Sequence, residues 1–284
     1  MKVLVAGAGG MVGRAVARHC AKSGDEVLPL DHESLDITDN DRVRQCLDRE
    51  RPEVIINCAA WTDVDGCEID SERAFAVNAL GPELLAKNCG RTGASLITIS
   101  TDYVFDGNKD GFYDQRDDPN PISIYGAAKL EGERRAQRAC ARTTVVRSGF
   151  IFGIGGRNFL STVIDRGRHH EPLTAIANAY GTPTYARDLA RRLRELALLD
   201  LPGIYHVVNA GEGASYHQFA LAALAAVQCD SSKLTPVSMD ELDRPAPRPR
   251  NARLRCLLSQ AIGLEPLPFW QDGLREFARE LGAT

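Results

Sequence analysis

Short apolar runs alternate with longer stretches of helical periodicity through the first half of the chain. The apolar runs predict strands at residues 2–6, 26–30, 53–59, 95–100 and 143–147. The stretches between them predict helices at 11–21, 71–88 (with Gly90 near its end) and 125–140, and one capped by Thr38 or Asp39. Runs that are apolar along their whole length are typical of parallel strands buried on both faces. The alternation predicts an α/β fold with a Rossmann-like doubly wound parallel sheet.

The pattern changes after Ser148, where loops lengthen and prolines gather. Helices are predicted at 186–199 and 215–228, and a strand at 204–208. We expect a dinucleotide-binding Rossmann domain over residues 1–148 and mainly a smaller C-terminal substrate-binding subdomain over 149–284. Later segments near 181–190 and 235–255 are candidates to return to the first domain.

Composition narrows the class of protein. The chain has 284 residues, 44% of them hydrophobic, and a net charge of −4, so a nucleic-acid partner is not expected. The apolar runs are too short for a membrane span, which needs about 18 residues. The apolar stretch from Val3 runs into glycines rather than a signal-peptide pattern. The eight cysteines are scattered without Cys-x-x-Cys spacing, which favours a reduced, cytoplasmic protein without structural zinc.

A glycine triplet follows the first predicted strand directly. Gly7, Gly10 and Gly13 stand where that strand turns into a helix. Glycine permits the close approach of a pyrophosphate that a side chain would block, and a helix N-terminus offers free N–H groups. Asp31 ends the second strand, near the spacing expected for an acid on ribose hydroxyls, although a solvated carboxylate is the alternative. The acid without an adjacent arginine favours NAD, while His32 could assist a 2′-phosphate.

Tyr125 and Lys129 stand four residues apart in a predicted helix, so their side chains share a face. A nearby ammonium favours the phenolate and is expected to lower the pKa of a tyrosine from its usual value of about 10. A phenol tuned in this way suits a general acid that protonates a carbonyl oxygen while a hydride arrives. The alternative is a half-buried tyrosine beside a solvated lysine.

Further motifs occur along nearly the whole chain. They are Gly7-Ala-Gly-Gly-Met-Val-Gly13, Leu35-Asp-Ile-Thr-Asp39, Asn57-Cys-Ala-Ala-Trp-Thr-Asp-Val-Asp65, Cys67-Glu68, Asn78, Ser100-Thr-Asp-Tyr-Val-Phe-Asp-Gly107, Tyr125-Gly-Ala-Ala-Lys129, Gly181-Thr-Pro-Thr-Tyr-Ala186 and Arg248-Pro-Arg-Asn-Ala-Arg-Leu254. With these motifs the chain resembles the extended short-chain dehydrogenase/reductases, and more closely the dTDP-4-dehydrorhamnose reductase family. The resemblance implies NAD(P)H-dependent reduction of the C4 keto group of dTDP-4-dehydro-L-rhamnose to dTDP-L-rhamnose.

The resemblance also implies a role for each matching residue. The catalytic residues would be Tyr125 as proton donor, Lys129 as the group that holds the nicotinamide ribose and tunes Tyr125, and Thr101 as a hydrogen-bond donor to the substrate oxygen. The cofactor, NADPH or NADH, would contact Gly7, Gly10, Met11, Val12, Gly13, Asp31, Asp36, Ile37, Ala60, Trp61, Thr62, Tyr125 and Lys129. The dTDP-linked deoxysugar would contact Thr101, Asp102, Phe150 and Arg248. No metal, nucleic acid or membrane is expected as a partner, and a homodimer is compatible with the sequence.

Three positions depart from the family pattern. Phe150 replaces a tryptophan, Asn178-Ala179 replaces Asp-Gln, and Arg187 replaces a glutamate that binds magnesium at a dimer contact in some members. They leave open a reductase or epimerase for another nucleotide-linked deoxysugar. A non-catalytic nucleotide-binding subunit resembling the methionine adenosyltransferase beta subunit is a third alternative. Likewise Arg248, with Arg250 and Arg253, is either a diphosphate clamp or a solvated basic loop.

Overall fold

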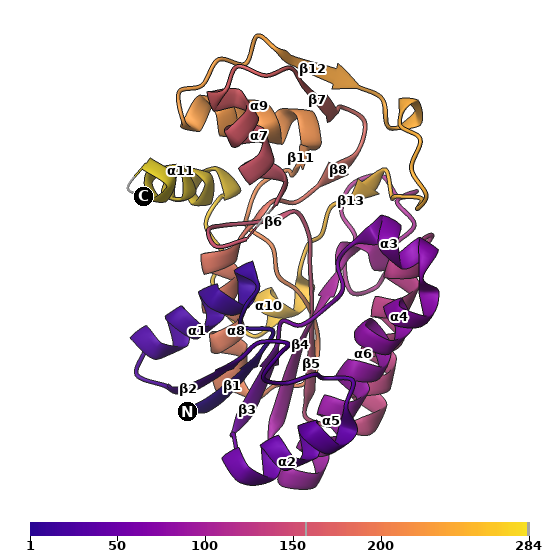
Figure 1. Ribbon diagram of the computed structural model, residues 1–284, viewed down its shortest axis with the longest axis vertical. Coiled ribbons are helices and arrows are strands. Elements are labelled where there is room, and N and C mark those ends of the chain that lie inside the picture. Colours follow the sequence, from indigo (N-terminus) through magenta and orange to yellow (C-terminus); the bar gives the residue numbers. More distant parts are fainter. Residues whose placement is uncertain (157, 283–284) are drawn as a thin grey trace.

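Six parallel strands form the central sheet of the computed structural model, which describes residues 1–156 and 158–282 (Figure 1). In spatial order they are β10 (Gly203–His206), β5 (Thr143–Ser148), β4 (Ser95–Thr101), β3 (Val54–Asn57), β1 (Lys2–Ala6) and β2 (Glu26–Leu30). Every neighbouring pair runs parallel. The predicted doubly wound sheet is therefore confirmed, and each predicted strand overlaps an observed one.

The order of the strands reverses at β1. The chain passes from β1 to β2 on one side of it and then returns to β3 on its other side. In open parallel sheets, ligands bind in the crevice beyond the carboxyl ends of the strands at such a switch point. The turns that follow Ala6 and Asn57 therefore border the expected ligand crevice.

Helices cover both faces of the sheet, as Figure 1 shows. On one face α1 (Met11–Lys22) packs against α8 (Ala186–Leu199), over an apolar cluster that includes Val5, Ile56 and Leu193. On the other face lie α2 (Asn40–Glu50), α5 (Gly81–Thr92) and α6 (Ile124–Ala139). Asp39 caps α2 by accepting hydrogen bonds from two backbone N–H groups, as one of the two predicted caps. Both faces of the sheet are thereby buried, which explains why its strands are apolar throughout.

The helix predicted at 71–88 is wrong in detail, because the structure divides it. It contains α4 (Ser71–Phe75), a π-helical segment (Ala76–Leu80) and α5, which ends at Gly93 with φ +83° rather than near Gly90. The Asn78 side chain accepts from the Trp61 N–H and donates to the Trp61 carbonyl, both at 2.9 Å. Single π-helical turns occur often at functional sites, and this one fastens the loop that follows β3.

The second half of the chain builds an upper layer and also contributes to the sheet (Figure 1). The upper elements are β6 (Ile151–Phe152), α7 (Phe159–Arg168), β7 (Leu173–Ile176), β8 (Tyr180–Gly181), β9 (Thr184–Tyr185), β11 (Ala214–Ser215), α9 (Tyr216–Ala226), β12 (Leu234–Val237), β13 (Asn251–Ala252) and α11 (Trp270–Gly282). The remaining short helices are α3 (Val64–Ile69), α10 (Leu257–Ala261) and 3₁₀ turns at Asp102–Val104 and Met239–Glu241. Trp270 begins α11, and its ring meets that of Phe219 edge-on at 5.6 Å. The return of α8 and β10 to the sheet mixes the two halves of the chain.

The described residues bear on two expectations from the sequence, the reduced state of the cysteines and the lack of a membrane span. All eight cysteines are free thiols, and five of them are buried. No helix within residues 1–156 and 158–282 combines the length and the apolar character that crossing a membrane requires.

Candidate functional site

The glycine turn after β1 is packed too closely for side chains. Gly7 adopts φ +74°, and a Cβ there would lie 2.6 Å from the backbone nitrogen of Ala59 in the loop after β3. A Cβ at Gly13 would lie 2.2 Å from the Gly7 carbonyl oxygen. Gly10 is the N-cap of α1 and supplies no side-chain cap, so the first N–H groups of that helix face the crevice without a side-chain acceptor. The turn thus forms a backbone cradle suited to a pyrophosphate.

One cavity extends from this turn toward the end of β2, with a volume of about 510 Å³. Its lining includes eight residues expected at the cofactor, namely Gly7, Gly10, Asp31, Asp36, Ile37, Ala60, Trp61 and His32. Hydrogen bonds from Ser34 to Asp31, and from Thr38 to Asp36, hold the pKa of each carboxyl below its usual value. Both carboxylates are therefore charged acceptors at neutral pH, as binding of ribose and adenine donors requires.

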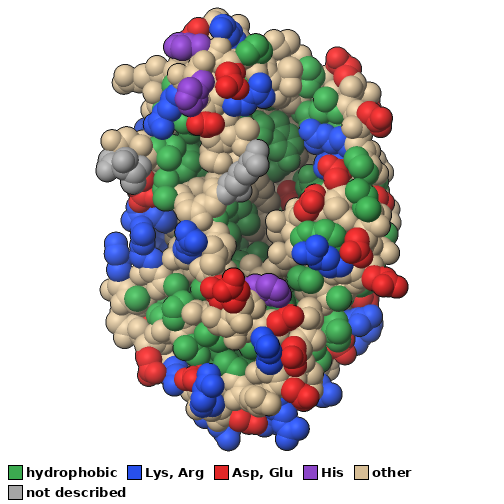
Figure 2. All heavy atoms as spheres, in the orientation of Figure 1, with side chains coloured by type: hydrophobic (Ala, Val, Ile, Leu, Met, Phe, Trp, Pro, Cys, Tyr) green, Lys and Arg blue, Asp and Glu red, His purple; other side chains and the backbone are tan. Residues whose placement is uncertain are grey.

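A second cavity, also of about 510 Å³, continues from the glycine turn across the ends of β4 and β5. It brings together Gly10, Met11, Val12, Gly13, Ala60, Thr62, Thr101, Asp102, Tyr125, Lys129 and Phe150. Figure 2 shows the molecule hollowed between its upper and lower parts, with hydrophobic side chains in the hollow. Residues far apart in the sequence thus line one continuous crevice at the predicted edge of the sheet.

Tyr125 and Lys129 share the inner face of α6, but their protonation differs from the sequence-based expectation. Burial raises the pKa of Tyr125, and Lys129 is not among the groups that act on it. The Lys129 ammonium donates to the Ile99 carbonyl at 2.7 Å, and burial lowers its pKa to about 8. The expected lowering of the tyrosine pKa is therefore wrong for this structure, because desolvation dominates. The phenol is fully protonated at neutral pH, which is the form that a general acid needs.

Thr101 and Asp102 follow β4 and lie against Tyr125. The Thr101 hydroxyl donates to Asp102 Oδ1 at 3.0 Å, and its hydrogen bond to the Tyr125 phenol opposes part of the rise in pKa that burial causes there. The other oxygen of Asp102 packs where a Cβ on Gly149 would approach it to 2.1 Å. Burial raises the pKa of Asp102 to about 7.

Phe150 forms an aromatic wall of the crevice. Its backbone adopts φ +44°, a left-handed conformation that costs about 1–3 kcal/mol in a non-glycine residue and clusters at functional sites. The ring centroid lies 4.2 Å from that of Tyr216, and the ring fills the space that a side chain on Gly181 would need. A smaller cavity of about 130 Å³ lies behind it.

Arg248 does not line either half of the crevice. Its guanidinium forms an ion pair with Asp65 of α3, at 2.6 and 2.8 Å. This pair joins the proline-rich loop to the Rossmann part of the chain and lowers the pKa of Asp65. The predicted contact between Arg248 and a substrate diphosphate stays a prediction.

The sequence reasoning missed several residues that line the crevice. Ser100 and Ser148, at the ends of β4 and β5, have buried hydroxyls without a hydrogen-bond partner in the described chain. Arg73 lies over the Trp61 ring at 4.4 Å and borders the cavity beside the glycine turn. Position at a strand end could have indicated the serines, whereas the contact of Arg73 forms only where the loop that carries Trp61 folds against α4.

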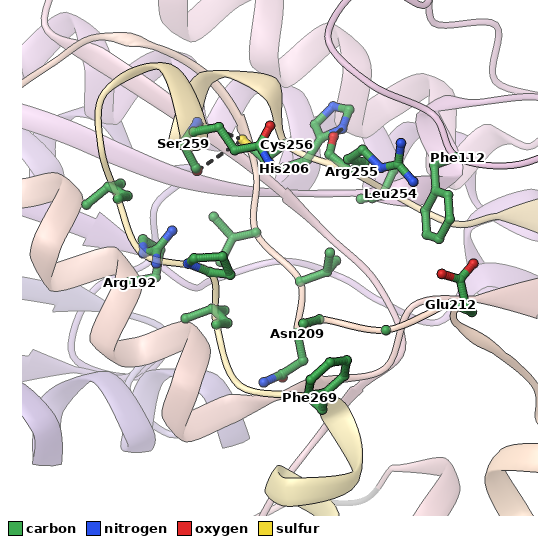
Figure 3. A pocket seen from close by; sticks show the side chains of 18 residues that line it. Phe112, Arg192, His206, Asn209, Glu212, Leu254, Arg255, Cys256, Ser259 and Phe269 are labelled. Atoms are coloured by element: carbon green, nitrogen blue, oxygen red, sulfur yellow. Dashed lines mark hydrogen bonds between the residues drawn. The ribbon is translucent and has the colours of Figure 1, made fainter.

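Another cavity of about 320 Å³ lies at the β10 edge of the sheet, separate from the crevice (Figure 3). Several of its polar groups have partners within the protein, whereas His206 Nε2 is buried without one among the described residues. Cys256 Sγ accepts from Ser259, and the amide of Asn209 donates to Asp188 at 2.7 Å. Arg192 is paired with Glu195 at 2.7 Å. The residues predicted to be catalytic and to bind the cofactor line the crevice, and none of them lines this cavity.

Comparison with known proteins gives matches along the whole chain. Residues 1–283 match the family model described as RmlD substrate binding domain. The chain is 40% identical to a dTDP-4-dehydrorhamnose reductase of Mycolicibacterium smegmatis, covering 100% of this chain and 87% of that protein. It is 35% identical to a probable dTDP-4,6-dihydroxy-2-methyloxan-3-one 4-ketoreductase of Streptomyces antibioticus, covering 97% and 94%. The crystal structure of dTDP-4-dehydrorhamnose reductase from Bacillus anthracis in complex with NADP superimposes with a TM-score of 0.95 at 34% identity, covering 98% and 99%.

Proposed function

Because this chain belongs to the RmlD substrate binding domain family, we propose that it reduces the C4 keto group of dTDP-4-dehydro-L-rhamnose with NADPH or NADH. The product is dTDP-L-rhamnose. One observation carries the proposal: Thr101, Tyr125 and Lys129 meet in a crevice that also contains the glycine turn. The relatives named as dTDP-4-dehydrorhamnose reductases supply the substrate class.

The residues of the crevice fit a dinucleotide. The cradle at Gly7 and Gly13 leaves no room for side chains, and it presents helix N–H groups to a pyrophosphate. Asp31 accepts for the adenosine ribose, and Lys129 holds the nicotinamide ribose. When bound, the reduced nicotinamide supplies the hydride. The B. anthracis relative was crystallised with NADP, so NADPH is the first cofactor to test, with NADH beside it.

Two side chains act on the substrate carbonyl, and a third holds the cofactor. Tyr125 donates its proton to the carbonyl oxygen, which develops negative charge as hydride reaches the carbon. Thr101 supplies a hydrogen bond to the same oxygen, and the enclosed site strengthens both interactions by excluding water. Lys129, on the same face of α6 as Tyr125, holds the nicotinamide ribose in place beside the tyrosine. The upper part of the chain, including Phe150, covers the sugar. The domain boundary at residue 148, the homodimer and the cytoplasmic location stay predictions.

The substitution Tyr125→Phe tests the proposal. We expect kcat to fall by about 10²–10⁴-fold, the usual contribution of a positioned general acid, with little change in thermal stability. The assay follows loss of NADPH or NADH absorbance with dTDP-4-dehydro-L-rhamnose. Tyr205→Phe is the matched control, because it removes a buried hydroxyl that bonds to the Leu201 carbonyl, remote from the crevice. Wild-type turnover in the Tyr125 variant would falsify the acid role.

A second candidate is reduction of another dTDP-linked keto-sugar. The S. antibioticus relative acts, by its name, on a different dTDP-linked ketone. At the departing positions, the Asn178 side chain is occupied by Ser238 and the Met239 N–H, and Ala179 is buried. Neither offers a polar group to the sugar. Product analysis with a panel of dTDP-keto sugars separates the two reductases, and an epimerase would show no net oxidation of the cofactor.

A further inference from the structure

Asp102 is a buried carboxyl with one oxygen engaged and one free. Its side chain is 3% exposed, and Oδ1 accepts from Thr101 at 3.0 Å. Oδ2 has no hydrogen-bond partner within the described residues. The absence of a side chain at Gly149 makes room for this oxygen, since a Cβ there would come within 2.1 Å. The backbone therefore holds the carboxyl in a fixed place beside Thr101.

The Thr101 hydroxyl connects this carboxyl to the phenol of Tyr125. It donates to the carboxyl at 3.0 Å and also forms a hydrogen bond that lowers the pKa of the phenol, yet it carries only one proton. When Asp102 is protonated it can donate to the Thr101 oxygen, which leaves the Thr101 proton free to turn toward the Tyr125 oxygen. The Thr101 hydroxyl thus interacts with both the phenol and the carboxyl, where it can pass a proton from one to the other.

The surroundings of Asp102 favour its neutral form. The ionisable groups that face it are three phenols, those of Tyr103, Tyr125 and Tyr216. No cation of the described chain forms an ion pair with it, since Lys129 bonds to the Ile99 carbonyl. Arg248 and Arg244 act on the tyrosines rather than on the carboxyl, and Arg248 is already paired with Asp65. With burial raising its pKa to about 7, a large share of Asp102 carries a proton at neutral pH.

Building on the proposed function, we propose that Asp102 is the proton reservoir of the site and restores the proton of Tyr125 through Thr101. During turnover the substrate carbon gains hydride, and its oxygen gains the Tyr125 proton. The tyrosinate then takes the Thr101 proton while Thr101 takes the carboxyl proton of Asp102. The products are the alcohol and the Asp102 carboxylate, which solvent reprotonates between turnovers through the cavity that it lines.

The first test compares the pH profile of kcat in wild type and Asp102→Asn. Asparagine has the same shape but cannot supply a proton to Thr101. In wild type, kcat should fall once as pH rises through about 7, as Asp102 ionises, and again near 8, as Lys129 loses its proton. In D102N the first fall should vanish, and kcat at low pH should drop on the order of 100-fold. Cofactor affinity should change little, because Asp102 lies beyond the glycine turn.

Thr101 variants and infrared spectra give independent readouts. Thr101→Ser keeps the hydroxyl and should keep the fall near pH 7, whereas Thr101→Val removes the hydroxyl and should lose it. Without cofactor or substrate, wild type should show the C=O stretch of a protonated carboxyl that fades as pH rises through about 7 and is absent in D102N. If D102N does not fold, the serine and valine pair and the wild-type spectrum decide the question.

The outcomes separate the reservoir from the reaction. If wild type is active and D102N has the same kcat and the same pH profile, the proposed reservoir role of Asp102 is wrong, while the proposed function stands. A spectrum without any protonated carboxyl would lead to the same conclusion. A wild type that oxidises neither NADPH nor NADH with any dTDP-keto sugar would refute the proposed function, and the reservoir with it.

Discussion

The glycine turn makes the sharpest prediction, because two of its glycines meet different surroundings. A Cβ on Gly13 would lie 2.2 Å from the Gly7 carbonyl oxygen and 2.8 Å from Ala8 Cα, both backbone atoms. Gly7 cannot retreat, since it is itself packed against the backbone of Ala59. A Cβ on Gly10 would meet nothing closer than the Gly7 oxygen at 3.5 Å, an ordinary contact, at an unstrained φ of −81°. Gly13→Ala therefore distorts the turn, whereas Gly10→Ala only adds a methyl group at the crevice.

The expected magnitudes differ accordingly. In Gly13→Ala, overpacking costs about 1–3 kcal/mol, and the better helix propensity of alanine returns about 1 kcal/mol. The start of α1 must shift by about 1 Å, which costs the pyrophosphate one or two charge-assisted hydrogen bonds of about 1.5–3 kcal/mol each. Affinity for NADPH should then fall at least about tenfold. Gly10→Ala should change the unfolding free energy by less than about 1 kcal/mol, while it still weakens NADPH binding.

Urea unfolding and titration of NADPH fluorescence measure the two effects separately. Gly90→Ala in α5 is the control, because it adds a methyl group to a helix remote from the crevice, 3.3 Å from the Ala139 carbonyl oxygen. It should alter stability without altering the Kd for NADPH. A Gly13→Ala protein that binds NADPH as tightly as wild type would refute the assignment of this turn as the pyrophosphate cradle.

Two further predictions concern buried charge. Burial raises the pKa of Asp102 in the folded protein from 3.8 to about 7, so wild type loses stability as pH rises between these values. D102N avoids that loss, and by pH 8 its free energy of unfolding should have gained up to roughly 4 kcal/mol relative to wild type. Urea unfolding at a series of pH values measures the difference. A flat difference between the two proteins from about pH 4 to 8 would contradict the buried, neutral carboxyl. Glu133→Gln should destabilise the protein by about 3–5 kcal/mol, because it leaves the buried Arg147 guanidinium without the negative charge that lies 2.7 Å from it. The double change Glu133→Leu, Arg147→Met should recover most of the loss. A single variant as stable as wild type would show that water reaches the Arg147 guanidinium.

The sheet was largely predictable from sequence because burial on both faces leaves its strands uniformly apolar. The runs at Lys2–Ala6 and Glu26–Leu30 match β1 and β2 residue for residue. The π-helical turn at Ala76–Leu80 was not predictable, because its cause is a contact between Asn78 and Trp61 across the fold. The two-residue strands of the upper layer were missed for a similar reason, since two residues have no periodicity to detect.

The relative placement of site residues was predictable where both residues belong to the same helix. The spacing of Tyr125 and Lys129 puts them on one face of α6 whatever surrounds that helix. Their pKa values were not predictable, because they depend on burial beneath the upper part of the chain. The same holds for Arg248, whose pairing with Asp65 joins residues 183 positions apart.

Burial favours the neutral form of all three titratable groups of the crevice. It raises the pKa of Tyr125, lowers that of Lys129 to about 8 and raises that of Asp102 to about 7. Each shift favours the neutral form, because an enclosed site solvates charge poorly. The pKa values of the lysine and the carboxyl consequently approach each other, although their usual values lie far apart. Asp102 therefore keeps a proton near pH 7, where a carboxyl of ordinary pKa would have lost it. The enclosure that strengthens hydrogen bonds to the substrate oxygen thus also leaves a proton beside Thr101 to replace the one that Tyr125 donates.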